Sequence, residues 1–162
     1  MENGDLGQDF DVFIDFAHTP NGLEQALKTL SSQLTVHSSW LIAVFGAAGE
    51  RDQSKRAPMG QIASVYADII ILTAEDPRRE NVQDICYQIA RGIKVRIKDK
   101  DYFTVTDRKE AINFAIKLAK KGDIVAFFGK SHEKSMTYGK KEVPWDEFAA
   151  VEDAIRKRLN EK

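Results

Sequence analysis

The sequence predicts an α/β domain of three layers, with a mostly parallel sheet of about six strands and one antiparallel or hairpin edge. Three observations support this prediction: short apolar runs recur along the chain, segments of helical periodicity lie between them, and a polar loop follows each run. Strands that alternate with helices pair in parallel, and ligands of such sheets bind at the carboxyl ends of the strands. The chemistry of this chain is therefore expected on one rim of the sheet.

Five apolar runs have the length and composition of buried strands. They span residues 12–16, 41–45, 69–72, 103–105 and 124–128. The polar loops that follow them are residues 15–20, 46–52, 75–79, 106–108 and 129–133. Because every strand is followed by such a loop, we expect these loops to lie together on the rim.

Helices are predicted between the strands, where apolar residues recur at spacings of three and four. The segments are residues 23–30, 59–66, 82–89 and 111–119. Thr19 is expected to cap the first helix, with Pro20 at its first position, and Asp107 with Glu110 forms a capping-box-like pair before the fourth.

The alternation stops after residue 133. A polar stretch at 136–143 contains Gly139 and predicts a hairpin or an antiparallel edge strand. A final amphipathic helix is expected from about residue 145 to residue 159. Residues 1–9 are expected to be a residual interdomain lead-in with a cut end, so one domain is predicted over residues 10–162.

The composition fits a single domain with one core. Lys and Arg total 24 against 25 Asp and Glu, so no overall field favours nucleic acid or a membrane as a partner. No apolar stretch approaches the roughly 20 residues that cross a bilayer, and the acidic start is unlike a secretory signal. The single Cys86 cannot form an intrachain disulfide and is expected in the core. These features predict a cytoplasmic protein.

Arginines on two of the rim loops are candidates for anion binding. Arg51 and the pair Arg78 and Arg79 follow different strands and are placed to meet across the crevice. There a guanidinium can hold a carboxylate or a phosphate by two hydrogen bonds, whereas the alternative is an exposed ion pair worth under about 1 kcal/mol. Lys130 has two interpretations, a point charge directed toward an anion or a solvated loop lysine.

No phosphate loop, metal site or catalytic triad is evident. Residues 129–131 read Gly-Lys-Ser, but Ile124 stands where a P-loop needs its earlier glycine, and residues 46–49 lack the spacing of a dinucleotide loop. His18 lies on the rim, and His37 lies near the opposite end and is given no role. Without a nucleophile beside a base, we assign no catalytic residue and no metal ligand to this chain.

Five ordered motifs resemble the C-terminal domain of the Mur ligases, and most closely those members that add the third amino acid to UDP-N-acetylmuramoyl-L-alanyl-D-glutamate. The motifs are DFAHTPNGL at 15–23, FGAAGERD at 45–52, KR with MG within 55–60, EDPR at 75–78 and GKSHE at 129–133. Their order and spacing cover most of residues 10–155.

The resemblance implies a Rossmann-like domain that closes over ATP and presents the incoming amino acid to an acyl-phosphate. It also implies that ATP and Mg²⁺ are bound mainly by a central domain outside this chain, and that the partners are an N-terminal domain, the central domain, the UDP-MurNAc-dipeptide and a diamino acid. Asp15, His18 and Thr19 match positions that border the nucleotide. Positions that hold meso-diaminopimelate match Arg51, Asp76, Arg78, Gly129 and Glu133.

The substrate stays open between diaminopimelate, lysine and another amino acid. Arg78 and Arg51 suit a distal carboxylate and Glu133 a distal ammonium, which favours diaminopimelate. The family pattern Asp-Asn-Pro-Arg, however, appears here as Glu-Asp-Pro-Arg, Ser131 replaces a glycine, and Asn21 replaces an acid. An aspartate at 76 cannot donate a hydrogen bond to a carboxylate.

Two alternatives remain at this point. A receiver-like signalling module also places acids after the first and third strands and a lysine after the fifth, which Asp15, Asp76, Thr106 and Lys130 superficially fit. A folylpolyglutamate-type ligase would take glutamate as the incoming amino acid.

Overall fold

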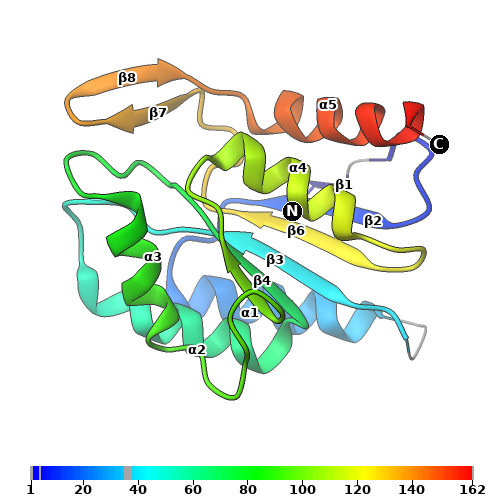
Figure 1. Cartoon of the computed structure of the whole chain (residues 1–162), viewed down its shortest axis with the longest axis horizontal. Coiled ribbons are helices and arrows are strands. Elements are labelled where there is room, and N and C mark those ends of the chain that lie inside the picture. Colours follow the sequence, from blue (N-terminus) through cyan, green and yellow to red (C-terminus); the bar gives the residue numbers. More distant parts are fainter. Residues whose placement is uncertain (1, 4, 35–37, 162) are drawn as a thin grey trace.

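The computed structural model describes residues 2–3, 5–34 and 38–161, so His37 lies outside the described residues. A twisted sheet lies between two layers of helices, α1 to α3 on one face and α4 with α5 on the other (Figure 1). The helices are α1 (Pro20–Gln33), α2 (Arg56–Tyr66), α3 (Val82–Ala90), α4 (Arg108–Leu118) and α5 (Glu147–Asn160), with a short 3-10 helix η1 (Gln53–Lys55) before α2. This confirms the predicted three-layer α/β class.

The main sheet has six strands in the order β1-β2-β6-β3-β4-β5. These strands are β1 (Glu2–Asn3), β2 (Asp11–Asp15), β3 (Leu41–Phe45), β4 (Ile69–Leu72), β5 (Tyr102–Thr104) and β6 (Ile124–Phe128). Every pairing is parallel except that of β1 with β2. The segment expected to be a lead-in therefore supplies an antiparallel edge to the sheet.

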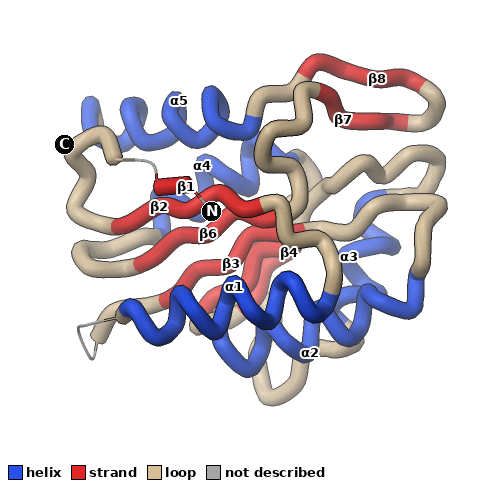
Figure 2. Tube along the Cα trace, turned by 180° about the vertical axis from the view of Figure 1, so that it is seen from behind, coloured by secondary structure: helices blue, strands red, loops and turns tan. Residues whose placement is uncertain are grey.

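A separate two-stranded sheet follows β6, formed by β7 (Ser135–Tyr138) and β8 (Lys141–Pro144). The hairpin prediction is confirmed, but the hairpin does not extend the main sheet. It lies beyond the ends of the strands, next to the loop after β4, as seen from both sides (Figures 1 and 2). The backbone of Arg78 joins it there, since its N–H donates to Thr137 O at 3.0 Å and its carbonyl accepts from Gly139 N at 2.6 Å.

The core has two halves, one on each face of the sheet. Strands β3, β4 and β6 are buried along their whole length, as expected for apolar strands covered on both sides. Cys86 packs in the half under α1 to α3, where burial raises the pKa of its thiol to about 12, so its predicted core role is confirmed. Among the described residues, no helix has an apolar stretch long enough to span a bilayer.

Candidate functional site: the loops at the carboxyl rim

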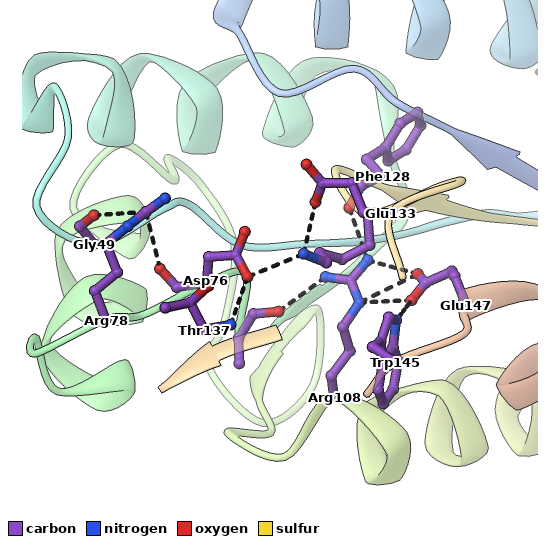
Figure 3. A network of polar contacts seen from close by, with 11 residues as sticks. Gly49, Asp76, Arg78, Arg108, Phe128, Glu133, Thr137, Trp145 and Glu147 are labelled. Carbon is purple, nitrogen blue, oxygen red and sulfur yellow. Dashed lines mark hydrogen bonds and ion pairs between the residues drawn. The ribbon is translucent and has the colours of Figure 1, made fainter. Parts of the chain in front are cut away.

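The loops after β2, β3, β4 and β6 meet on the rim at the carboxyl ends of these strands. Gly49 N–H donates to Asp76 O at 3.0 Å, which joins the loops after β3 and β4. Gly129 N–H donates to Asp15 O at 3.1 Å, which joins the loops after β6 and β2. The expected convergence of polar loops is therefore present, and Figure 3 shows its centre.

The glycines of the loop after β3 allow close packing against the loop after β4. A Cβ on Gly46 would lie 2.1 Å from Thr73 O, and one on Gly49 would lie 1.8 Å from Pro77 O. Both distances are far inside van der Waals contact. These glycines therefore allow the two rim loops to pack against each other. This gives them a structural role that needs no dinucleotide-binding loop.

The arginines of the rim differ in their partners. Arg78 Nη1 donates to Gly49 O at 2.9 Å, and Arg79 forms a 2.6 Å ion pair with Glu50. Arg51 is exposed, and its Nη1 contacts Glu50 O at 3.4 Å. Arg78 and Arg79 thus both bind the segment of residues 49–50, which directly precedes Arg51. Arg79 forms an exposed ion pair, which was the alternative to anion binding for these arginines.

A buried lysine connects two of the predicted amino-acid-binding residues. Lys130 is 1% exposed, and its Nζ lies 3.0 Å from Asp76 Oδ1 and 2.6 Å from Glu133 Oε2. Thr137 N–H of the hairpin donates to the same Asp76 oxygen at 2.8 Å. The interpretation of Lys130 as a solvated loop lysine is therefore wrong, because its ammonium is enclosed by two carboxylates.

Glu75 is a buried carboxyl group next to Gly129, the residue that precedes this lysine. It is 6% exposed, and its Oε2 has no hydrogen-bond partner among the described residues. Burial raises the pKa of this carboxyl to about 7, although the charges of Arg108, Lys55 and Lys130 oppose the shift. Gly129, at φ 103°, makes room for it, since a Cβ there would lie 2.3 Å from Glu75 Oε2.

The predicted nucleotide-bordering residues form the loop that enters α1. Thr19 caps the helix as expected, with Oγ1 accepting from Gly22 N at 3.1 Å, and Asp15 Oδ1 accepts from Ala17 N at 2.7 Å. The His18 ring lies 4.9 Å from the half-exposed ring of Phe16, edge to face. Lys55 Nζ donates to His18 O at 2.9 Å, which fixes this loop against η1.

Sequence reasoning missed a buried ion pair behind the rim. Arg108 of α4 and Glu147 of α5 have side chains 1% and 0% exposed, and they meet at 2.6 Å. Both residues lie on the apolar stripes of their helices: Arg108 precedes Ala111 and Ile112, and Glu147 precedes Ala150 and Val151. A charged residue at such a position is the sequence signal that points to a buried pair.

The sequence model of one family, described as the Mur ligase, glutamate ligase domain, matches residues 1–131. The chain belongs to the C-terminal domain family of the Mur ligases. This membership, expected from the five motifs, excludes a receiver-like module. Ser131 adopts φ 41°, a backbone region that glycine enters more easily. This conformation explains why the usual Mur ligase motif has a glycine at this position.

Named Mur ligases align along nearly the whole chain. The UDP-N-acetylmuramyl-tripeptide synthetase of Borreliella burgdorferi is 48% identical over 155 residues, which are 96% of this chain and 30% of that protein. The UDP-N-acetylmuramoyl-L-alanyl-D-glutamate–2,6-diaminopimelate ligase of Caldanaerobacter subterraneus is 42% identical over 155 residues, or 96% of this chain and 31% of that protein. The chain thus spans about a third of the length of these curated relatives.

Solved structures agree with this assignment. A diaminopimelate ligase of the same name superposes with a TM-score of 0.88 at 34% identity, covering 98% of this chain and 31% of that one. A bifunctional folylpolyglutamate synthase/dihydrofolate synthase from Yersinia pestis has a TM-score of 0.57 at 17% identity, covering 95% of this chain and 30% of that one. The second likeness shows a common fold alone.

Proposed function

We propose that this chain is the amino-acid-presenting, ATP-closing domain of a cytoplasmic ligase that adds a diamino acid to UDP-MurNAc-L-Ala-D-Glu. The names of the relatives support the reaction class, and the spans of those relatives support N-terminal and central domains as its partners. One structural observation supports the site most: the loops holding Arg51, Asp76, Arg78, Gly129 and Glu133 lie against one another on one rim.

The far end of the amino acid is assigned to charges of opposite sign. Within the described residues, the hydrogen bonds of the Arg78 guanidinium use Nη1 alone, which leaves its other donors for a distal carboxylate, and Arg51 follows in the loop to which Arg78 is attached. Glu133 has a side chain 43% exposed and suits a distal ammonium, which would share it with Lys130. The α-amine then points away from these groups, toward the activated carboxyl of the acceptor, and the domain contributes orientation.

The loop that enters α1 fits a nucleotide. The exposed Phe16 ring beside His18 offers an aromatic surface to a base, and the positive end of the α1 dipole, next to Thr19, favours a phosphate nearby. ATP supplies the phosphoryl group that activates the acceptor carboxyl, and Asp15, His18 and Thr19 would border it. For Mg²⁺ the described residues gather no set of three acids, histidines or cysteines, so we assign its ligands to the central domain.

Of the two diamino acids considered, diaminopimelate and lysine, we infer that diaminopimelate is the substrate. Asp76 replaces the usual asparagine, but its Oδ1 already accepts from Lys130 and from Thr137 N–H. Lys130 balances its charge, so Asp76 need not repel a distal carboxylate that Arg78 holds. Lysine, which lacks that carboxylate, would leave Arg78 without its partner.

The test compares Arg78→Ala with Arg79→Ala in the complete ligase to which we assign this domain. Loss of a desolvated carboxylate partner costs about 2 to 5 kcal/mol, so Arg78→Ala should raise the diaminopimelate KM about 30-fold or more. The ATP KM should change little. Arg79→Ala removes a neighbouring arginine that pairs with Glu50 on the surface, and both KM values should stay near wild type.

Two further outcomes separate the alternatives. Equal increases in both KM values would assign Arg78 to the nucleotide or to the fold. Glutamate used better than diaminopimelate would favour a folylpolyglutamate-type ligase. The chain of 162 residues alone is the negative control, since it has no P-loop and should form no amide.

A further inference from the structure

The buried pair of Arg108 and Glu147 has no part in the proposed binding of substrate, yet it lies directly behind the site. Removing two charges from water is costly, and apolar residues of similar volume are often as stable in such a place. Stability alone therefore does not account for this pair. Its hydrogen bonds point to another role.

The guanidinium of Arg108 holds the ends of the two strands from which the site loops depart. Its Nη1 donates to Ala74 O at 2.9 Å and its Nη2 to Phe128 O at 2.9 Å. Ala74 directly precedes Glu75, where the Glu-Asp-Pro-Arg motif begins, and Phe128 directly precedes Gly129. Because the donors of a guanidinium lie in one rigid plane, these two carbonyls are held at a fixed separation.

Glu147 fixes the guanidinium in turn. Its carboxylate accepts from Arg108 Nε at 2.9 Å and from Nη2 at 2.6 Å, and Trp145 Nε1 donates to it at 2.8 Å. Trp145 N–H also donates to Lys134 O at 2.9 Å, at the base of the hairpin. The group that orients Arg108 is thus connected to the segment that supplies Thr137 to Asp76 (Figure 3).

We propose that Arg108, oriented by Glu147, is a positioning residue for the amino-acid site. It sets the spacing between the loop of Asp76 and Arg78 and the loop of Gly129 and Glu133 without touching substrate. Lys130 joins the same two loops at their outer side through Asp76, so the loops are tied at two depths. This inference rests on the proposed function, because a substrate held from both loops is sensitive to shifts of about 1 Å in their separation.

The test replaces the pair by apolar residues of similar size, Arg108→Met with Glu147→Leu, so that no unpaired charge stays buried. In the complete ligase, the diaminopimelate KM should rise at least tenfold while the ATP KM stays within twofold. Arg108→Lys keeps the positive charge but loses the planar set of guanidinium donors. Its diaminopimelate KM should therefore lie between those of the wild type and the double variant. Asp123→Ala is the control, since Asp123 is buried at the opposite rim, where it accepts from Trp40 N and Lys120 N, and should leave both KM values within twofold.

A second measurement does not depend on activity. In the chain of 162 residues, amide hydrogen exchange reports on Gly49, Thr137 and Glu133, whose N–H groups bond within the site loops. The double variant should exchange these amides at least tenfold faster relative to the core amide of Val44. Asp123→Ala should show no such selective increase.

The outcomes separate this inference from the proposed function. Unchanged exchange in the double variant would overturn the positioning role, and so would faster exchange with an unchanged diaminopimelate KM. Selectively faster exchange in the double variant, together with a complete wild-type ligase that accepts no diamino acid, would uphold the loop spacing and reject the proposed function. If the double variant does not fold, Arg108→Lys is judged by the same two measurements.

Discussion

The two rims of the sheet use acidic side chains in different ways. At the amino rim, Asp123 accepts from Trp40 N and Lys120 N, both at 2.8 Å, and Asp68 accepts from Leu41 N at 2.8 Å. These carboxylates satisfy backbone donors that the sheet leaves unpaired. Their role is complete within the fold.

At the carboxyl rim, the buried Glu75 and Glu147 and the partly buried Asp76 face cations instead. Glu147 binds Arg108, Asp76 binds Lys130, and Glu75 lies among these charges with one oxygen unpaired. Such an arrangement is costly to bury and sensitive to the loss of any member. The comparison shows that ion pairs are concentrated at the rim where loops must be held for a ligand. At the opposite rim, the acids only accept hydrogen bonds from backbone N–H groups.

The largest expected difference between the rims is in stability. Arg108→Ala leaves Glu147 as an uncompensated buried charge and should lower the free energy of unfolding by about 3 to 5 kcal/mol. Asp123→Ala leaves backbone donors unpaired and should cost about 1 to 3 kcal/mol. Urea denaturation of both variants measures the two values, and equal losses would remove the distinction between the rims.

The pH dependence of stability provides a second test, at Glu75. The pKa of this carboxyl rises from 4.5 to about 7 on folding, so the folded state favours its protonated form. Its contribution to stability is fully present below about pH 4.5 and is lost as the pH rises through 7. Glu75→Gln cannot ionise, and its stability relative to wild type should increase between pH 5 and pH 8, by up to about 3 kcal/mol.

Thermal or urea unfolding of both proteins at several pH values measures this difference. The charges that face Glu75 are Arg108 from α4, Lys55 from η1 and Lys130 with Asp76 from the rim loops, and all are present in both proteins. A stability difference that does not change with pH would show that Glu75 is ionised throughout.

The sequence alone predicted the layout of the fold and the placement of the polar loops on one rim. Three of the five predicted parallel strands have the observed bounds, because apolar runs between polar loops define them well. The predicted caps at Thr19 and Asp107 also form, since they depend on local spacing.

The sequence was insufficient for the partners of the charged residues. Whether Lys130 is solvated or enclosed depends on Asp76, which is 54 residues away along the chain. The hairpin was predicted, but not that its Thr137 amide would bind Asp76. Long-range pairing of this kind has no periodicity, although a charge on an apolar helix stripe, as at Arg108, indicates that a partner exists.

The smallest expected effects concern backbone strain at the two rims. Ser131 at the carboxyl rim and Val95 in the connection before β5 adopt φ 41° and φ 57°. Glycine enters this region without steric penalty, so Ser131→Gly and Val95→Gly should each raise the free energy of unfolding by about 0.5 to 1 kcal/mol. Urea midpoints of the two variants test this. A loss of stability on Ser131→Gly alone would show that contacts of the buried Ser131 side chain outweigh the strain.

The position of Glu147 has a practical consequence for how the domain is delimited. The family match ends at Ser131, whereas the partner of Arg108 lies 16 residues beyond that point. A fragment trimmed to the matched region would keep the arginine in an apolar setting while discarding α5, which covers one half of the core. Expression boundaries chosen from the family match alone would therefore yield an aggregation-prone product, and the last helix must be retained to obtain a soluble one.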